Sequence, residues 1–228
     1  ILGRDEKKLA MAEKELSMLA KSKVIATQCD LASEKDINRV FERTKNKFGS
    51  IDILVNNQGG PIPGIFEEIS LNQTRDAISI NLLSSLILTK LCLPDMKKKQ
   101  WGRIINILSV SAKEPMPDMF LSNMVRPAVI GFAKSISYDY ADQGITVNNL
   151  LPSSVLTDRT SFFVQQDAEE LGISFDEALK LAGEALPPKY IATAEEFAQL
   201  AIFLSSDKAS YINGTSICID GGSTKALL

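Results

Sequence analysis

The sequence predicts an α/β fold in which a parallel sheet is doubly wound, with helices on both faces. Short, continuous apolar runs of the kind that form fully buried strands alternate with segments of helical apolar spacing. Neither a repeat nor a low-complexity linker interrupts this alternation. The chain has 228 residues, of which 45% are hydrophobic and 23% charged, a composition that suits one globular domain over residues 1–228.

The first part of the chain contributes two predicted helices and two predicted strands. Helical spacing of apolar residues covers 5–20, and the run VIAT at 24–27 is typical of a short buried strand. In the next helix, Ser33 is the expected N-cap and Gly49 the expected stop. A second strand, IDILVN, follows at 51–56.

The same alternation continues to the end of the chain. The expected helices lie at about 71–80, 81–97, 120–142 and 194–205, and the expected strands at 103–108, 145–151 and 215–220. Residues 153–190 interrupt the pattern with mixed polarity, and only a short helix is expected within them, at about 175–185. We expect this long segment to cover a substrate.

Composition narrows the possible functions. A net charge of -3 and a pI near 5.2 offer no basic face, so no nucleic-acid partner is expected. Cys29, Cys92 and Cys218 lie far apart in the sequence, so neither a metal site nor a disulfide framework is expected. Such a cysteine pattern is typical of a reduced, cytoplasmic protein. The chain has no histidine, so proton transfer must use other groups. We see no signal peptide and no apolar run near the roughly 18 residues of a membrane span, so no membrane association is expected.

Functional residues are expected where the parallel strands end. Ligands of such sheets bind outside the carboxyl ends of the strands. Here those ends are Leu2, Gln28, Asn56, Leu108 and Leu151. The segment NNQGG at 56–60 follows one of them, and its two glycines would let a ligand approach the backbone closely. A simple tight turn would account for the same residues.

Several motifs occur in a fixed order along the chain. They are NNQGG at 56–60, GRIINILS ending at Ser109, Pro152-Ser153, and GTSICIDGG at 214–222. In this order they resemble the short-chain dehydrogenase/reductase family, in particular its acyl-carrier-protein ketoreductase-like branch, over essentially the whole chain. The resemblance implies a Rossmann-like sheet and an NAD(P)-dependent oxidoreductase. Such an enzyme moves a hydride between nicotinamide and a carbonyl or alcohol carbon, as a 3-oxoacyl reductase does.

The resemblance also implies which residues contact the cofactor. They are Arg4, Asp30, Leu31, Asn57, Gly59, Arg126 and Pro152. Asp30 matches the acidic residue beside the adenine ring, and Arg4 falls where a basic residue commonly accepts the 2′-phosphate of NADP. NADP is therefore expected, with NAD as a possible substitute. A solvated arginine at a helix start is the alternative interpretation of Arg4.

The N-terminus departs from the family pattern. Ile1-Leu2-Gly3-Arg4 resembles the end of the family's second strand, so the opening strand and its glycine-rich phosphate loop have no counterpart. That strand lies inside the family's sheet, and without it two rows of backbone groups would stay unpaired. We therefore expect the first strand and helix of the domain to be missing from this sequence.

The second departure concerns the catalytic pair. Aligned without gaps from Ser109, the family's Tyr-x-x-x-Lys falls on SNMVR, so Ser122 replaces the tyrosine and Arg126 the lysine. A phenol with a pKa of about 10 can be lowered by a nearby ammonium until it shuttles a proton near neutrality. A serine hydroxyl is shorter and far more basic. Arg126 can still hold ribose hydroxyls with its fixed positive charge, so the positioning role is expected to survive better than the acid role.

If another group supplies the proton, Lys113 and Glu114 are the nearest titratable candidates, although a solvated loop position explains both. Tyr138 and Tyr140 lie about 24–27 Å along the helix from Ser122, which excludes them. Pro127 removes a hydrogen bond from the helix interior, so the helix is expected to kink or to begin later than the pattern suggests.

The leading hypothesis is an NADP-preferring oxidoreductase acting on a small-molecule carbonyl or alcohol. Asn81, at the start of the long apolar helix, and Ser109 would position the reacting oxygen, and Arg126 would hold the ribose. The alternative is a nucleotide-binding protein with little or no turnover, a sensor or partner subunit. A third hypothesis is different chemistry on the same scaffold. The stretch 80–96 is apolar nearly all round, which predicts a homodimer or homotetramer that covers this helix.

Overall fold

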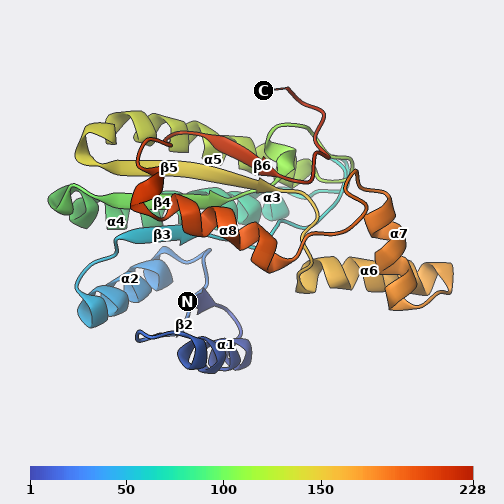
Figure 1. The fold of residues 1–228 in the computed structure, drawn as a ribbon, viewed down its shortest axis with the longest axis horizontal. Helices are drawn as coiled ribbons and strands as arrows, with labels where there is room; N and C mark the ends of the chain where they lie inside the picture. Colours follow the sequence, from blue (N-terminus) through green and yellow to red (C-terminus); the bar gives the residue numbers. More distant parts are fainter. Residues whose placement is uncertain (228) are drawn as a thin grey trace.

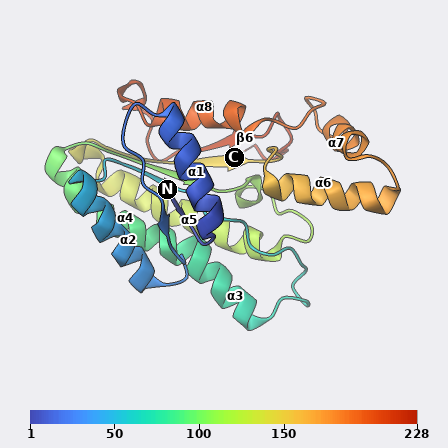
Figure 2. The ribbon, with the colours of Figure 1, turned by 90° about the horizontal axis from the view of Figure 1, so that it is seen from below.

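The computed structural model describes residues 1–227, and a four-stranded parallel sheet forms its centre (Figure 1). Its strands lie in the order β3 (Ile53–Asn56), β4 (Gly102–Ile107), β5 (Ile145–Pro152) and β6 (Ser216–Ile219). Seen from below in Figure 2, α8 (Ala194–Leu204) covers one face, and α4 (Ser84–Lys99) and α5 (Phe120–Asp139) cover the other. The predicted α/β fold, with its parallel sheet between two helical layers, is confirmed.

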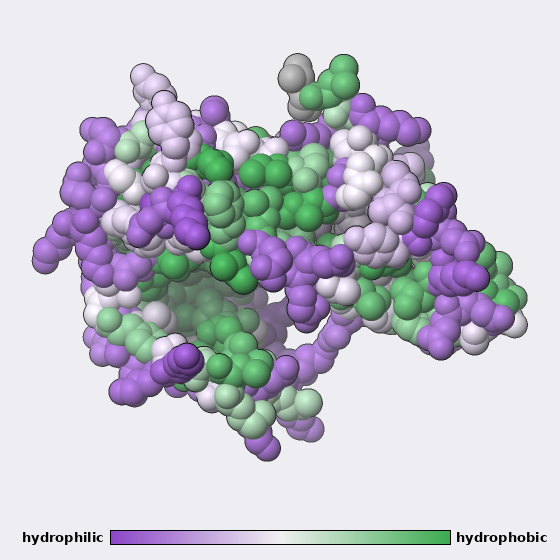
Figure 3. All heavy atoms as spheres, viewed as in Figure 1, coloured by the Kyte–Doolittle hydropathy of each residue, from purple (hydrophilic) through white to green (hydrophobic). Residues whose placement is uncertain are grey.

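A separate parallel pair of strands lies beside this sheet. It consists of β1 (Leu2–Gly3) and β2 (Thr27–Gln28). The strand expected at 24–27 is therefore shorter than predicted and begins at the last residue of the predicted range. Figure 3 shows a hollow with hydrophobic residues between the two sheets. Val55, on the edge strand β3, is 46% exposed.

The helix α1 (Glu6–Leu19) follows β1, and the side chain of Asp5 caps it by accepting hydrogen bonds from the backbone N–H groups of Lys7 and Lys8. Only Leu9 is buried on its predicted apolar face, while Leu19 is exposed. Contacts with β1 and β2 therefore hold this helix through a narrow stripe of side chains.

The helix α2 (Glu34–Phe48) confirms the predicted caps. The Ser33 hydroxyl accepts a hydrogen bond from the backbone N–H of Asp36, and Gly49 ends the helix with a φ of 87°. The left-handed region is readily open only to glycine, which explains why the helix stops there. Ile37, at 0% exposure, anchors α2 in the main core cluster.

One continuous helical segment replaces the two helices expected at 71–80 and 81–97. It contains α3 (Leu71–Ala77), a π-helical stretch (Ile78–Leu83) and α4. By length and composition it could cross a membrane, which contradicts the expectation that no apolar run comes near that length. A buried core helix meets the same criteria, and Cys92 and Met96 of this helix are fully buried in the core beneath β3 and β4.

The helix α5 begins at Phe120, so the later start expected from Pro127 is wrong. Proline lacks the N–H that would bond to the carbonyl of Asn123, one turn earlier. The Asn123 side chain fixes the approach to the helix instead, because its amide both accepts from the N–H of Met116 and donates to the carbonyl of Met116. The helix ends at Asp139, a little before the predicted boundary, and a 3₁₀ turn (Ala141–Gln143) follows.

The segment 153–190 contains two helices where one was expected. The unpredicted helix is α6 (Asp158–Leu171), which Thr157 caps at its start and Gly172 at its end. The predicted one is α7 (Phe175–Glu184), which packs against α6. Together they extend from the body of the domain, beyond the carboxyl ends of the strands (Figure 1).

A ladder of asparagine amides crosses the main sheet near these carboxyl ends. Asn56 donates to the side chain of Asn106, and Asn106 donates in turn to that of Asn149, each at 2.8 Å. Asn149 then donates to the Ser216 hydroxyl at 3.0 Å. The four residues are direct register partners on β3, β4, β5 and β6. Because the amides are almost wholly buried, the ladder fixes this register at the edge where the functional residues emerge.

Candidate functional site

Two cavities open at the carboxyl ends of the strands, and both are bounded by the loop after β3. Asn57, Gly59, Gly60 and Pro61 line each of them. The first, the Arg4 cavity, has a volume of about 420 Å³ and reaches from this loop to β1. The second, the Arg126 cavity, has a volume of about 620 Å³ and reaches from the loop to α5 and α6. Both cavities lie at the strand ends where functional residues are expected from the sequence, and that location stays a prediction.

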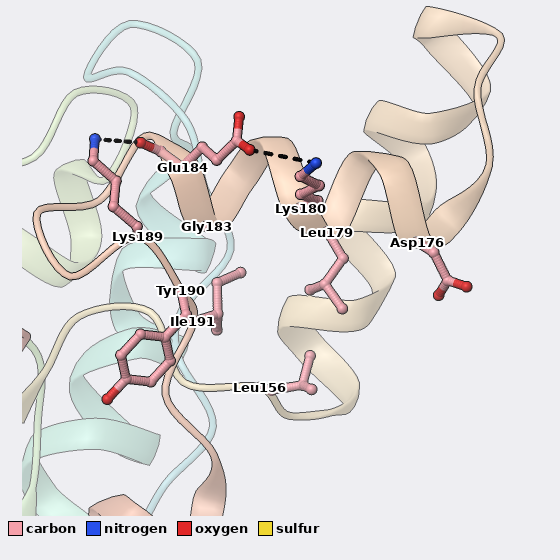
Figure 4. A pocket seen from close by; sticks show the side chains of 9 residues that line it. All are labelled: Leu156, Asp176, Leu179, Lys180, Gly183, Glu184, Lys189, Tyr190 and Ile191. Atoms are coloured by element: carbon pink, nitrogen blue, oxygen red, sulfur yellow. Dashed lines mark hydrogen bonds and ion pairs between the residues drawn. The ribbon is translucent and has the colours of Figure 1, made fainter.

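A third cavity, of about 820 Å³, is larger but lies elsewhere, between α7 and the loop after it (Figure 4). None of the predicted site residues is among the described residues that line it. Two of its lysines already have partners, since Lys180 pairs with the Glu184 carboxylate at 3.8 Å and Lys189 donates to the Glu184 backbone carbonyl at 2.8 Å. Size therefore does not identify the functional site in this protein.

The Arg4 cavity gathers most of the predicted cofactor residues. Those that line it are Arg4, Asp30, Leu31, Asn57 and Gly59. Arg4 is exposed, and its guanidinium forms no ion pair within residues 1–227. The carboxylate of Asp30 accepts a hydrogen bond from the N–H of Ala32 at 3.0 Å, which fixes the turn after β2. The cavity thus places a free cation and a fixed carboxylate at one end of a ligand site.

Asn81 holds the loop between the two cavities. Its side-chain amide donates to the Gly59 carbonyl at 2.9 Å, from the π-helical stretch before α4. Gln58 is buried beside it and donates to the hydroxyl of Ser85 at 2.8 Å. Asn81 lines the Arg4 cavity and not the Arg126 cavity, so the structure does not bring it beside Ser109 as expected. Its contacts are those of a positioning residue.

A group of hydroxyls lies in the Arg126 cavity. The Ser109 hydroxyl accepts from the backbone N–H of Ser111 at 3.1 Å, just after β4. The Ser111 hydroxyl lies 2.8 Å from that of Ser122, on the first turn of α5. Ser109 and Ser122 both line the cavity, so the structure brings these two predicted residues together. Ser111 was missed, because nothing in the sequence distinguishes it from its neighbouring serines.

Arg126 is a buried cation that has almost no partners. It lies one turn after Ser122 and is only 3% exposed. Its one hydrogen bond within the described chain runs from Nη1 to the Ile107 carbonyl at 3.3 Å, and Nε has no acceptor. Burial, together with the nearby charge of Arg159, lowers the pKa of Arg126 to about 10. The guanidinium therefore stays charged near neutrality, with most of its donors free for a ligand.

The remaining predicted residues divide between the cavity and its surroundings. Pro152, at the end of β5, lines the Arg126 cavity. Lys113 lines neither strand-end cavity, so the structure does not bring it to the site as expected. Glu114 binds the C-terminal segment instead, because its carboxylate accepts a hydrogen bond from the backbone N–H of Lys225 at 2.7 Å. Lys113 follows the 3₁₀ turn Val110–Ala112, and its backbone N–H donates to the Val110 carbonyl at 2.9 Å.

Arg159 is the main residue that sequence reasoning missed. It lies in the first turn of α6 and donates to the carbonyls of Gly60 and Pro61 at 3.0 and 2.9 Å. These bonds tie the helix to the loop that separates the cavities. A signal for it was present, because Thr157-Asp158 is an N-cap followed by an acidic first turn, and Gly172 marks the end of the helix.

The donors and acceptors of the site suit a dinucleotide. Arg126 offers unused N–H groups, and the buried Oε1 of Gln58 has no hydrogen-bond partner among residues 1–227. A ribose hydroxyl can satisfy both kinds of group, since it donates and accepts. Gly59 leaves open space where a side chain would begin, which lets a ligand approach the loop closely. In the other cavity Arg4 suits a phosphate.

Known reductases resemble this chain over most of its length. Residues 2–224 match the family described as enoyl-(acyl carrier protein) reductase. The NADPH-dependent reductase BacG of Bacillus subtilis is 33% identical over 218 residues, 96% of this chain and 84% of that protein. The 3-oxoacyl-[acyl-carrier-protein] reductase FabG of Haemophilus influenzae is 34% identical over 85% of this chain and 75% of its own length. The structure of L-sorbose reductase from Gluconobacter frateurii, complexed with NADPH and L-sorbose, covers 99% of this chain and 86% of that one. Its TM-score is 0.94, at 25% identity.

Proposed function

Since this chain belongs to the short-chain dehydrogenase/reductase family, we propose that it is an NADP-dependent oxidoreductase that reduces a small carbonyl compound of the 3-oxoacyl type. The observation that carries the proposal is the pair of cavities on either side of the loop from Asn57 to Pro61. One cavity offers Arg4 to a phosphate, and the other offers Ser109 and Arg126 to the reacting end of the complex.

Each side chain then has a defined task. The bound dinucleotide supplies a hydride to the carbonyl carbon. Arg126 holds ribose hydroxyls with its free N–H groups, and the Ser109 hydroxyl donates to the carbonyl oxygen and orients it. Asn81 keeps the loop in place through the Gly59 carbonyl. These tasks agree with the bonds each residue has and with the donors it has left.

The proton that converts the reduced oxygen into an alcohol must come from elsewhere. No carboxylate, lysine or tyrosine lies among the described residues that line the Arg126 cavity. The Ser122 hydroxyl is in reach of Ser111 but is far too basic to act as a neutral-pH acid by itself. We infer that water delivers the proton along the hydroxyls of Ser111 and Ser122, which makes the reaction slow.

The test is consumption of NADPH in the presence of carbonyl compounds. The purified protein is given NADPH and a panel of 3-oxo acids, 3-oxo esters and simple ketones, and nicotinamide absorbance is followed. We expect slow oxidation of NADPH with at least one 3-oxo compound and formation of the matching alcohol. Arg126→Met should abolish it, whereas Arg43→Gln, on the exposed face of α2, should not. Absence of both NADPH binding and turnover would contradict the proposal.

A second candidate is a nucleotide-binding protein with little or no turnover. The hydrogen bond between the hydroxyls of Ser111 and Ser122 favours it, because this bond occupies the position where an acid would be needed. Such a protein would bind NADPH as well as an enzyme does, yet no carbonyl compound would speed its oxidation. A direct binding titration run beside the turnover assay separates the two functions.

We also propose that the protein is cytoplasmic and assembles as a homodimer or homotetramer through α4 and α5. Small residues form an exposed strip on α5 at Pro127, Ala128 and Gly131, which would let a second helix approach closely. The absence of any disulfide framework in the sequence suits a reduced compartment. Sedimentation at micromolar concentration should give a dimer or larger species, and a stable monomer would contradict the proposal.

A further inference from the structure

The Arg126 cavity has an unbalanced positive charge. Two charged residues line it, Arg126 and Arg159, and no aspartate or glutamate is among its lining residues within the described chain. Arg126 is almost fully buried, and this burial is the main cause of its lowered pKa. The positive charge of Arg159 lies near enough to lower the pKa of Arg126 further. Two like charges that face one space raise each other's energy, most of all behind low-dielectric walls. A ligand with a negative charge would remove that cost.

The nearby acid does not balance Arg159. Asp158 precedes it in α6, but its carboxylate pairs with Lys8 at 2.9 Å. Arg159 itself forms no ion pair among the described residues, and its hydrogen bonds go to the neutral carbonyls of Gly60 and Pro61. Its guanidinium also lies over the Phe163 ring, 5.4 Å from the centroid, which restricts its position.

We propose that the substrate is an acid whose carboxylate binds in this cavity between Arg159 at the rim and Arg126 behind it. This inference rests on the proposed function, since it names the class of substrate for the same site. A planar guanidinium can bind a carboxylate through two parallel hydrogen bonds, and Arg159 is already held in place by two carbonyls and an aromatic ring.

The geometry also orients the substrate. Ser109 follows β4, Arg159 lies in the first turn of α6, and both line the cavity. A carboxylate at Arg159 would direct the rest of the molecule inward, so that its carbonyl group meets Ser109. Val155, Phe163 and Phe197 form an apolar part of the wall and suit a short hydrocarbon chain. A 3-oxo or 3-hydroxy acid has this arrangement of groups.

The experiment compares a 3-oxo acid with its methyl ester, which has the same carbonyl and lacks the charge. The wild-type protein should prefer the acid. Arg159→Gln should lower kcat/KM for the acid about 10- to 100-fold more than for the ester, because only the acid loses a charge-assisted contact. Arg159→Lys should retain part of the preference, because the charge remains. Arg43→Gln makes the same charge change on exposed α2 and should alter neither substrate.

A second measurement separates this inference from the proposed function. The corresponding 3-hydroxy acid and its amide are titrated calorimetrically into the protein without cofactor, so that no turnover is needed. Binding of the acid alone, lost in Arg159→Gln, supports the carboxylate site even if no NADPH oxidation is ever seen. Failure of the acid to bind wild-type protein overturns the inference. It is also overturned if Arg159→Gln weakens NADPH binding as much as it weakens use of the acid, since the charge would then serve the cofactor's diphosphate.

Discussion

Arg4 and Arg126 occupy the two ends of the same candidate site under opposite conditions. Arg4 follows the two-residue strand β1, is exposed, and has its guanidinium in solvent at the cavity edge. Arg126 lies within the 20-residue helix α5 and is 3% exposed, with one hydrogen bond to the part of the chain that the structure describes. Water stabilises the first charge and almost nothing but a ligand can stabilise the second. The two residues should therefore differ in how strongly a substitution affects both function and stability.

The largest effect on the rate of carbonyl reduction is expected when the family's catalytic Tyr and Lys replace Ser122 and Arg126. Ser122→Tyr together with Arg126→Lys would supply a phenol that reaches into the cavity and a lysine that lowers its pKa, restoring acid catalysis worth roughly 10²–10⁴-fold. The cavity of about 620 Å³ that Ser122 lines has space for the larger side chain. Steady-state kinetics with NADPH and a 3-oxo ester should show the gain.

The matched controls for that experiment are the two single variants. Each should give little improvement, because the phenol and the ammonium act as one unit. A double variant no faster than the wild-type protein would show that the site already obtains its proton efficiently, and the Arg126 end would then be a rebuilt active site. Ser111→Ala in the wild-type background would test that outcome, since it removes the hydroxyl partner of Ser122.

Arg126→Met should separate function from stability. It removes the group that we assign to the ribose, so turnover should fall by at least about 100-fold. Because it also removes a buried cation without an ionic partner, the Tm should rise, by about 2–4 °C for each kcal/mol gained. Scanning calorimetry and steady-state kinetics on the same preparation provide both values. A fall in Tm would mean that the single bond to Ile107 matters more than the cost of burying the charge.

Arg4→Ala should have a smaller and more selective effect. Removal of an exposed charge-assisted contact to the 2′-phosphate should weaken NADPH binding by about tenfold, near 1.5 kcal/mol, and leave NADH binding and the Tm almost unchanged. Fluorescence titration with each cofactor measures this. Equal losses for both cofactors would assign Arg4 to a shared part of the dinucleotide.

The smallest effect is expected from pH. The only ionisable side chains among the described residues that line the Arg126 cavity are the two arginines, and the pKa of Arg126 is lowered no further than to about 10. Arg126 therefore keeps its charge between pH 6 and 9, and kcat should vary less than about twofold across that range. A bell-shaped profile would reveal an acid or base that belongs to the reaction and lies outside this cavity wall.

The fold was predictable because its strongest signals are local. The N-cap at Ser33 and the stop at Gly49 bound α2 as expected, and the apolar runs located the strands of the main sheet. The helix α6 was missed because only Val164 and Ala168 are buried along it, which is too narrow a stripe to produce clear periodicity. The strand β2 was misplaced because pairing with β1, not apolarity, determines where it lies.

The candidate site was predictable in part, through strand ends and family resemblance. Ser109, Ser122 and Arg126 do line one cavity, and Arg4 and Asp30 line the other. The roles of Asn81 and Lys113 depend on which way a side chain points, and sequence spacing does not encode that. Arg159 reaches the site from a helix almost 100 residues beyond the loop it contacts, and only the tertiary fold brings the two together.

The asparagine ladder has a consequence for how this protein can vary. Every amide in it donates toward β6, and Asn106 both accepts from one neighbour and donates to the next. Replacing Asn106 alone by leucine would leave a donor of Asn56 and an acceptor of Asn149 buried without partners. One substitution would therefore lower the stability by the cost of two unsatisfied buried groups. Replacing the three asparagines together by apolar residues would remove these buried donors and acceptors at once, and only the half-buried Ser216 hydroxyl would lose a partner. The three positions should therefore co-vary, so that related sequences either keep Asn56, Asn106 and Asn149 together or replace all three.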